Sequence, residues 1–149
     1  MRIAIASDHG GFELKEALKP LLDELRIPYQ DFGTTSPDAV DYPDYAAIVG
    51  RKVAAGEFER GILACGTGIG MSIAANKIPG IRAAVVWDVN TARLARAHND
   101  ANIMTIGGRT TSAALARDIV RTFLITAFEG GGRHTRRVDK ISLLDCKDS

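Results

Sequence analysis

Short apolar runs alternate with segments of helical periodicity along the whole chain, and this order constrains the fold more than any other feature. The runs are continuous and are followed by turn residues, which is typical of strands buried on both faces of a sheet. They are Arg2–Ser7, Tyr29–Phe32, Gly61–Cys65, Ile81–Trp87 and Asn102–Gly107. Between the runs, apolar residues recur at helical spacing. One such segment holds Leu14, Leu18, Leu21, Leu22 and Leu25, and a later one holds Leu115, Ile119, Val120, Phe123 and Leu124.

Alternating strands and helices imply right-handed crossovers and a parallel sheet covered on both sides. The sequence therefore predicts the α/β class: a three-layer Rossmann-like domain with a five-stranded parallel sheet flanked by helices. Residues 1–149 are predicted to form this single domain, without an internal repeat or a linker. The Glu129–Gly132 segment is predicted to end the long last helix of the domain, and Arg133–Arg137 to open a C-terminal helical tail.

Composition excludes several classes of protein. With 46% apolar and 25% charged residues in 149, the chain can bury a substantial core and is neither disordered nor collagen-like. The formal net charge is +1, so no domain-wide basic field exists to hold nucleic acid or an acidic membrane, and any anion site must be local. No secretory leader and no run of about 20 apolar residues is present, so we expect a cytoplasmic protein. Cys65 and Cys146 are expected to be free thiols, and Cys146 is given no role.

The ends of four predicted strands carry glycines or reactive side chains. In a parallel α/β sheet, ligands bind at the carboxyl ends of the strands, where the loops enter the next helices. The four loops are Asp8–Gly11, Cys65–Gly70, Trp87–Asp88 and Gly107–Arg109. The sequence therefore predicts a ligand site at this edge of the sheet.

A glycine-rich loop with Gly66, Gly68 and Gly70 opens a predicted helix, where free backbone N–H groups and the helix dipole favour an anion. It is not a dinucleotide fingerprint, because Met71 occupies the place of the last glycine, and no P-loop lysine is present. A tight connection without a ligand is the alternative. Cys65 precedes the loop, where a helix N-terminus favours a thiolate that serves as base or nucleophile. Alternatively, Cys65 is a small buried residue that ends a strand.

The polar residues outside this loop also have structural alternatives. Asp8 or Ser7 could cap the helix that starts near Phe12. His98 could be a helix-terminal histidine stabilised by the dipole, with Asn99 in the left-handed position.

Cations also gather in the tail, as Arg133, His134, Arg136 and Arg137. Arg133 and Arg137 are four residues apart, so one helix face can present both guanidinium groups to a phosphate. A solvated basic surface is the alternative for this cluster. Arg109 is either a further anion ligand or a salt-bridge partner.

Seven motifs in order cover nearly the whole chain. They are Ser7–Gly11 (SDHGG), Asp41–Ala46 (DYPDYA), Cys65–Lys77 (CGTGIGMSIAANK), Gly80–Val85 (GIRAAV), Ala95–Ile103 (ARAHNDANI), Gly107–Arg109 (GGR) and Gly132–Val138 (GRHTRRV). Through them the chain resembles the ribose-5-phosphate isomerase B and galactose-6-phosphate isomerase (RpiB/LacAB) family. The resemblance implies an aldose–ketose isomerase of pentose 5-phosphates that needs no cofactor and no metal. It also implies a homodimer or a pair of dimers, in which the tail from about residue 130 packs on the neighbouring subunit and completes its active site.

The resemblance also implies a role for individual residues. Cys65 matches the catalytic base and Thr67 the hydroxyl beside it, while His98 and Asp8 match the groups that open the furanose ring. Some relatives carry a glutamate as base inside the glycine loop, and Met71 at that place supports Cys65. The remaining matches bind substrate: His9, Arg133 and Arg137 the phosphate, Tyr42 and Asn99 the sugar, Gly66, Gly68, Ile69 and Gly70 the enediolate, with His134 and Arg109 as further ligands.

The function expected from these residues is interconversion of D-ribose 5-phosphate and D-ribulose 5-phosphate through an enediolate, with Cys65 as base. An isomerase of hexose 6-phosphates, allose or galactose 6-phosphate, is the alternative within the family. A phosphate- or nucleotide-binding module without catalysis is the alternative from another class. A redox thiol ranks last, because Cys65 has no partner within a C-x-x-C.

Overall fold

The computed structural model describes residues 1–145 and contains one parallel sheet of five strands. Its strands are β1 (Ile3–Ser7), β2 (Tyr29–Asp31), β3 (Arg60–Cys65), β4 (Ala83–Val85) and β5 (Ile103–Gly107), in the spatial order β2-β1-β3-β5-β4. Every neighbouring pair is parallel. The predicted fold class is therefore confirmed.

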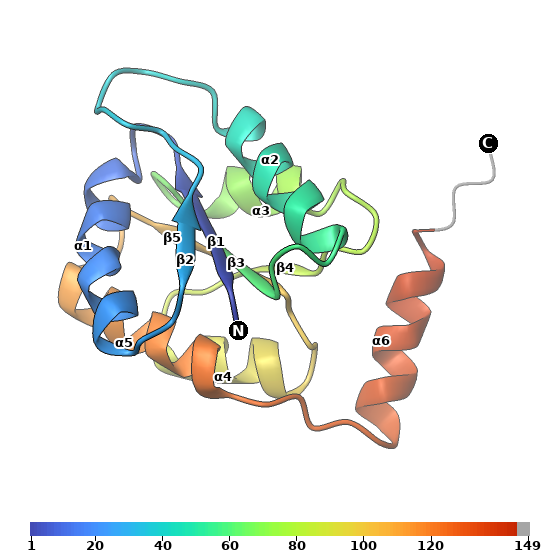
Figure 1. Cartoon of the computed structure of the whole chain (residues 1–149). Coiled ribbons are helices and arrows are strands. Elements are labelled where there is room, and N and C mark those ends of the chain that lie inside the picture. The colour runs from blue at the N-terminus through green and yellow to red at the C-terminus, as the bar shows by residue number, and fades with distance from the viewer. Residues whose placement is uncertain (146–149) are drawn as a thin grey trace.

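Helices cover both faces of the sheet (Figure 1). One face carries α1 (Phe12–Glu24), α4 (Val89–Ala97) and α5 (Ala113–Ile125), and the other carries α2 (Tyr42–Ala54) and α3 (Ile69–Ala75). The last helix, α6 (Arg133–Leu143), stands beside this body. Among the described residues, no helix combines the length and the apolar character that crossing a membrane requires.

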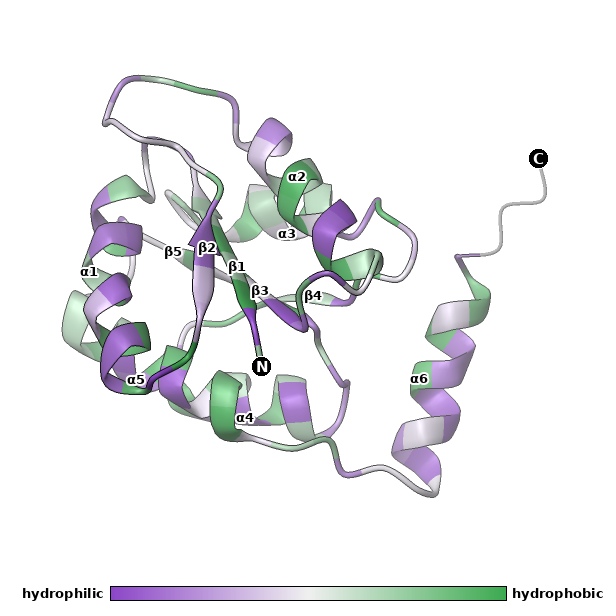
Figure 2. Ribbon diagram, in the orientation of Figure 1, coloured by the Kyte–Doolittle hydropathy of each residue, from purple (hydrophilic) through white to green (hydrophobic). Residues whose placement is uncertain are grey.

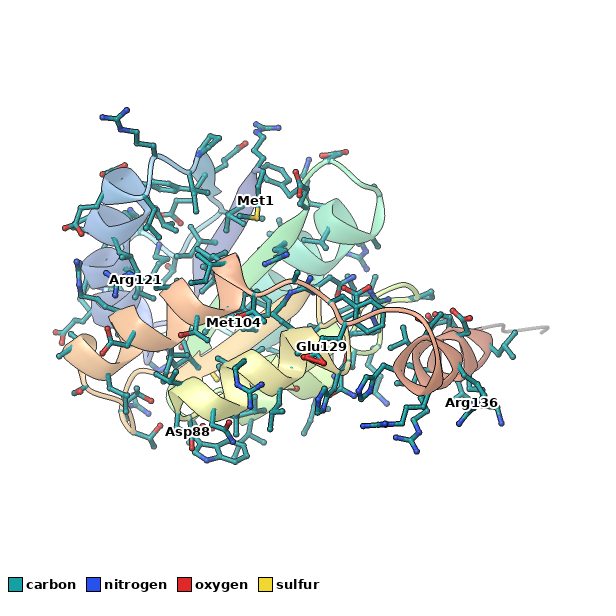
Figure 3. The ribbon with its side chains drawn as sticks, turned by 90° about the horizontal axis from the view of Figure 1, so that it is seen from below. Met1, Asp88, Met104, Arg121, Glu129 and Arg136 are labelled. Atoms are coloured by element: carbon teal, nitrogen blue, oxygen red, sulfur yellow. The ribbon has the colours of Figure 1, made fainter. Side chains whose placement is uncertain are left out.

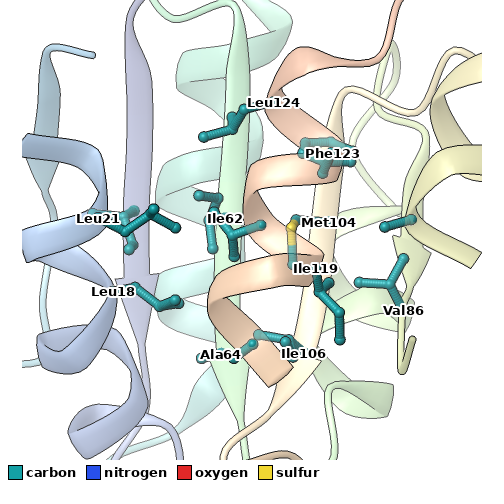
Figure 4. Packing of buried hydrophobic residues seen from close by; sticks show 14 of the residues in the cluster. Leu18, Leu21, Ile62, Ala64, Val86, Met104, Ile106, Ile119, Phe123 and Leu124 are labelled. Carbon is teal, nitrogen blue, oxygen red and sulfur yellow. The ribbon is translucent and has the colours of Figure 1, made fainter. Parts of the chain in front are cut away.

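The sheet separates two apolar cores. On the first face, leucines of α1 and the apolar stripe of α5 pack on Ile62, Met104 and Ile106 (Figure 4). On the second, Val49 and Met71 pack on the opposite side of the same strands. Apolar residues line the inside of the body and polar ones cover the outer helix faces, whereas α6 is largely hydrophilic (Figure 2).

Burial separates the central strands from the two edge strands. Every residue of β1 and β5 is buried, and β3 is buried after its first residue. The prediction that all strands are buried on both faces is wrong for β2 and β4, which are partly exposed because each has a neighbour on one side only. The β4 strand is also shorter than the predicted Ile81–Trp87. The Arg82 N–H donates to the Asn102 side chain at 2.8 Å, and the Trp87 N–H donates to the Thr91 hydroxyl at 3.3 Å. At both ends, the N–H group therefore bonds to a side chain instead of to the backbone of the neighbouring strand.

The connection to the tail begins earlier than predicted. The α5 helix ends at Ile125, because Thr126 has extended backbone angles (φ −83°, ψ 126°), and Glu129–Gly132 lies in the connection instead of at the helix end. The connection is tied to α4: the Thr126 carbonyl accepts from Arg96 at 3.2 Å, and the Glu129 N–H donates to the Ala97 carbonyl at 2.9 Å. The predicted tail helix is confirmed, and it starts beside the end of α4.

The direction of the chain places the loops at two edges of the sheet. The loops after β1, β3 and β5 lie at the carboxyl edge, whereas α4 runs back and ends at the amino edge, just before β5 starts. The α6 helix also begins at the amino edge (Figure 1). Between these edges lie the five residues of β5, which span roughly 15 Å.

Candidate active site

Cys65 is the last residue of β3 and is buried, with 3% of its surface exposed. Its Sγ accepts a hydrogen bond from the Gly68 N–H at 3.1 Å, and the Thr67 hydroxyl accepts one from the Ile69 N–H at 3.2 Å. Gly68 has φ +80°, and a Cβ there would lie 2.9 Å from the Ile106 backbone nitrogen, so only glycine fits. The loop therefore turns so that the Gly68 amide points at the Cys65 sulfur.

The loops after β1 and β5 pack against this glycine loop. The Gly108 N–H donates to the Cys65 carbonyl at 2.7 Å, and the Arg109 N–H to the Gly66 carbonyl at 3.0 Å. A Cβ on Gly10 would lie 2.9 Å from the Gly66 nitrogen, and one on Gly108 would lie 2.5 Å from the Gly10 carbonyl oxygen. Because no side chain separates these loops, three strand ends come together at one place.

Asp8 lies in the first of these loops and is buried. Its carboxylate accepts from the Gly11 N–H at 3.1 Å. The α1 helix begins after Gly11 and has no side-chain cap, so the hypothesis that Asp8 or Ser7 caps this helix is wrong. Asp8 instead closes the single turn that precedes α1, and this holds its carboxyl group at the carboxyl edge.

His9 and Arg109 line a depression of about 230 Å³ beside the glycine loops. His9 is half-buried, and its Nδ1 accepts from the Val40 N–H at 3.2 Å. In a neutral imidazole the other nitrogen, Nε2, then carries the proton and can donate. The Arg109 guanidinium lies against Gly66, where an added Cβ would be 3.1 Å from its Nη1. Two donors that suit an anion therefore lie at this edge.

A buried lysine anchors the segment that reaches His9. Lys15 is fully buried in α1, and its Nζ lies 2.8 Å from both carboxylate oxygens of Asp31 and donates to the Thr34 carbonyl at 2.5 Å. Burial alone would raise the pKa of Asp31, but hydrogen bonds from Lys15, Lys19 and the Gly33 N–H lower it below its ordinary value. Sequence reasoning missed this pair, although Lys15 lies three residues before Leu18, on the predicted apolar face of its helix.

Tyr42, at the start of α2, also reaches the glycine loop. It is 39% exposed, and its ring lies so close to Gly70 that an added Cβ would be 2.5 Å from two ring carbons. Extensive packing of α2 against α3 produces this contact. The structure thus gathers at the carboxyl edge the following predicted residues: Asp8, His9, Tyr42, Cys65, Gly66, Thr67, Gly68, Ile69, Gly70 and Arg109.

The remaining predicted residues lie at the amino edge. His98 is the residue after α4, and Arg133 and Arg137 are exposed on the first turns of α6. The hypothesis of a left-handed Asn99 is wrong, because the residue with positive φ is Asp100 (φ +48°). Asn99 instead lines a cavity of about 590 Å³ between β4 and α6. Cys146 lies outside the described residues.

His98 and His134 form a stacked pair, with ring centroids 4.2 Å apart and an interplanar angle of 14°. Glu129, labelled in Figure 3, lies on the connection from α5 to α6, and its N–H donates to the carbonyl of Ala97 at the end of α4. Partial desolvation, the neighbouring His98 and Arg133 lower the pKa of His134. This pair is the side-chain contact through which the start of α6 meets the end of α4.

The two histidines and Glu129 have ligand atoms within 4.8 Å of one another, a spacing that metal ligands also show. An imidazole binds a metal through a lone pair in its ring plane, and two nearly parallel, stacked rings cannot both point at one ion. Arg133, at the start of the same helix, would also repel a cation. The arrangement does not fit a metal ion.

Comparison with known proteins identifies the chain. The sequence profile of the family described as Ribose/Galactose Isomerase matches residues 3–141. A protein of Bacillus subtilis, whose name specifies a sugar phosphate isomerase and no particular sugar, is 52% identical over 143 residues, which is 95% of each chain. The chain belongs to the ribose/galactose isomerase family. The predicted family and the predicted enzyme class, an aldose–ketose isomerase, are confirmed.

Solved structures agree with this assignment. The ribose-5-phosphate isomerase B of Clostridium thermocellum is 50% identical to this isomerase, with a TM-score of 0.95 over 97% of both chains. That of Mycoplasma genitalium, which was solved with bound ribulose-5-phosphate, is 42% identical, with a TM-score of 0.92 over 97% of this chain and 95% of the other. The similarity therefore includes the tail as well as the sheet.

Proposed function

We propose that this isomerase interconverts D-ribose 5-phosphate and D-ribulose 5-phosphate through an enediolate, with Cys65 as the base. The observation that carries the proposal is the Cys65 sulfur, which lies at the end of a strand and accepts a hydrogen bond from the Gly68 amide at 3.1 Å. The relatives named for this reaction support the choice of substrate. No other thiol among residues 1–145 competes for the role, because Cys65 is the one cysteine described.

The chemistry requires a mobile proton and a place for negative charge. The Cys65 thiolate takes the proton from C2 of the open-chain aldose, a C1–C2 double bond forms, and the carbonyl electrons move to O1. Backbone N–H groups of the loop Gly66–Gly70 and the Thr67 hydroxyl stabilise this enediolate. The thiol then returns the proton to C1, O2 becomes the ketone oxygen, and the hydroxyl proton moves from O2 to O1.

The substrate phosphate needs charge-assisted donors away from the reacting carbons. At the carboxyl edge, His9 offers its Nε2 and Arg109 its guanidinium beside a depression of about 230 Å³. Asp8, held in the same loop, and His98 are the groups that we assign to opening the furanose ring. Asn99 and Tyr42 would contact the sugar, and Arg133 and Arg137 would complete the phosphate site.

One chain cannot supply all of these residues to one substrate molecule. Cys65 ends β3 at the carboxyl edge, whereas His98 and Arg133 lie at the amino edge, roughly 15 Å away along the strands. A pentose phosphate is much shorter than that distance. We therefore assign His98, Asn99, Arg133 and Arg137 to the site of a second subunit in a homodimer.

The tail supports this assembly. The α6 helix stands beside the sheet body, and it exposes the apolar residues Ile141 (41%) and Leu143 (69%). Exposed apolar side chains next to a charged helix face are typical of a surface that another subunit covers. The same helix then carries its arginines to the neighbouring glycine loop.

Substitution of the base tests the reaction. Cys65→Ala should lower the turnover of ribose 5-phosphate about 10³-fold, because general base catalysis contributes on that scale, while substrate binding stays largely intact. Lys140→Ala, on the exposed tail, is the control and should behave as the wild type. Turnover should be measured by ketose formation and binding by calorimetry, with allose and galactose 6-phosphates in the same assay. Unchanged turnover in Cys65→Ala would refute the proposed base, and faster turnover of a hexose phosphate would refute the proposed substrate.

Mixing two inactive variants tests the shared site. Arg137→Ala and Cys65→Ala chains, unfolded and refolded together, should recover about a quarter of the wild-type activity, because half of the dimers are mixed and each mixed dimer holds one whole site. Each variant refolded alone is the control. If mixing verified by mass spectrometry restores nothing, the sites are built within single chains.

A further inference from the structure

His98 lacks the hydrogen bonds that usually fix a catalytic imidazole. In the described part of the chain, neither ring nitrogen of His98 has a hydrogen-bond partner. Its backbone N–H donates to the Leu94 carbonyl of α4. The residue follows α4 directly and is half-buried, so one side of its ring is open to solvent. A histidine that transfers protons needs a fixed ring orientation, which a hydrogen bond to the other nitrogen usually provides.

The His134 ring supplies the contact that could replace such a bond. It lies on the His98 ring at 4.2 Å between centroids and 14° between planes, so it restricts rotation of the His98 ring out of that plane. His134 is itself held: it occupies the first turn of α6, and the connection before it is tied to α4 by the bond from the Glu129 N–H to the Ala97 carbonyl at 2.9 Å. The stacked pair therefore joins two anchored segments.

We infer that His134 is a positioning residue: by stacking on His98 it holds that imidazole in the orientation that opens the sugar ring. The inference rests on the proposed function and changes the expected role of His134, from a ligand of the substrate to a support for His98. In ring opening, the C1–O4 bond breaks, O4 receives a proton from one group, and a second group takes the C1 hydroxyl proton as the carbonyl forms. A misplaced His98 slows this step alone.

Two reactions of the same enzyme separate ring opening from isomerisation. Ribose 5-phosphate must be opened before it reacts, whereas ribulose 5-phosphate is acyclic, because its C5 hydroxyl is esterified. Exchange of the C1 proton of ribulose 5-phosphate with D₂O therefore reports the enediolate step without ring opening. Both reactions need the phosphate ligands, so damage to the tail or to its arginines would slow both.

The experiment compares His134→Ala with His134→Phe, which keeps a stacking ring but has no titratable nitrogen. Turnover of ribose 5-phosphate is followed by ketose formation, and C1 exchange by NMR. We expect His134→Ala to lower kcat for ribose 5-phosphate about tenfold, part of the 10²–10⁴-fold that an acid–base group contributes, with C1 exchange within about twofold of wild type. His134→Phe should restore kcat to within about threefold. Lys140→Ala is the matched tail control.

Each other result overturns the inference in a recognisable way. Equal loss of both reactions in His134→Ala would mean a structural or phosphate-binding role. No loss in either would mean that His98 needs no support. A His134→Phe variant as slow as His134→Ala would mean that the imidazole chemistry of His134 matters, and not its stacking. If the wild type shows neither turnover nor exchange, the proposed function itself has failed.

Discussion

The carboxyl and amino edges of the sheet are built in contrasting ways. At the carboxyl edge, backbone packs on backbone: the loops after β1, β3 and β5 touch through glycines, and the Gly68 amide donates to the Cys65 sulfur. At the amino edge, side chains at helix ends make the contacts, and a stacked histidine pair joins the end of α4 to the start of α6. The first arrangement is closely packed and made by loops of one chain, whereas the second leaves its arginines exposed. The contrast suggests that the reacting carbons require a fixed frame, while the groups that capture the substrate can arrive with a second subunit.

The largest expected difference between the two edges is in how much their ion pairs contribute to the free energy of unfolding. Asp31→Asn removes the nearer carboxylate of the fully buried Lys15 ammonium, leaves only the Glu16 carboxylate at 3.6 Å, and should cost about 3 kcal/mol. Asp100→Asn, at the amino edge, should cost about 1 kcal/mol or less, because Asp100 is one-third exposed and Arg96 also donates to the Ala101 carbonyl. Urea denaturation at pH 7 measures both. Equal losses of unfolding free energy in the two variants would contradict this difference between the edges.

The same pair sets a pH dependence. The pKa of Asp31 is lowered by folding from its ordinary 3.8, so the unfolded chain binds the proton more readily. The stability that Asp31 contributes is therefore present above about pH 4 and is lost as the pH falls through the folded pKa. Asp31→Asn should lack this part of the acid destabilisation, which denaturation at pH 3 and pH 7 would show. An unchanged acid profile would contradict the assigned charge state.

Two glycines with nearly the same φ angle separate the effect of packing from that of backbone strain. Alanine at Gly68 (φ +80°) or at Gly131 (φ +81°) should lower the free energy of unfolding by about 1 kcal/mol, because a Cβ is unfavourable in the left-handed region. Only at Gly68 does that Cβ also meet backbone, 2.9 Å from the Ile106 nitrogen, which should add about 1–3 kcal/mol. Gly131 has nothing within 4 Å. Thermal unfolding of the two alanine variants measures the difference. Equal shifts in Tm would contradict the close packing of the glycine loop.

The smallest expected effect is at the amino edge, where acid should weaken the stacked pair of His98 and His134. The pKa of His134 lies below its ordinary 6.5, so the pair is stacked with His134 neutral at pH 7.5. The stabilising contribution of the neutral form is present above about pH 6.5 and is lost as the pH falls through the folded pKa. Proton NMR titration of His134 should give a pKa below that of His134 in urea, and the lowering should become smaller in His98→Ala, because desolvation and Arg133 still act there. A raised value would contradict the stacked arrangement.

The sequence predicted the first edge well and the second poorly. Cys65, Asp8 and His9 all follow predicted strands, and parallel strands must end at the same edge, so their proximity could be deduced without coordinates. Lys15 and Asp31 were missed, because periodicity shows that Lys15 faces the core but not which acid meets it there. The end of α5 was placed too late, because Thr126 leaves the helix through contacts with α4 that no local pattern encodes.

The sequence by itself therefore determined the order of strands and helices, the family and the chemical character of the loops, since these follow from local patterns of apolar residues, glycines and reactive side chains. Only the tertiary structure decided that His98 and the tail arginines lie at the amino edge of the sheet, opposite the carboxyl edge that holds Cys65. The physical reason is the direction of α4, which carries the chain back across the sheet, and the extended connection after α5, which places α6 beside the end of α4.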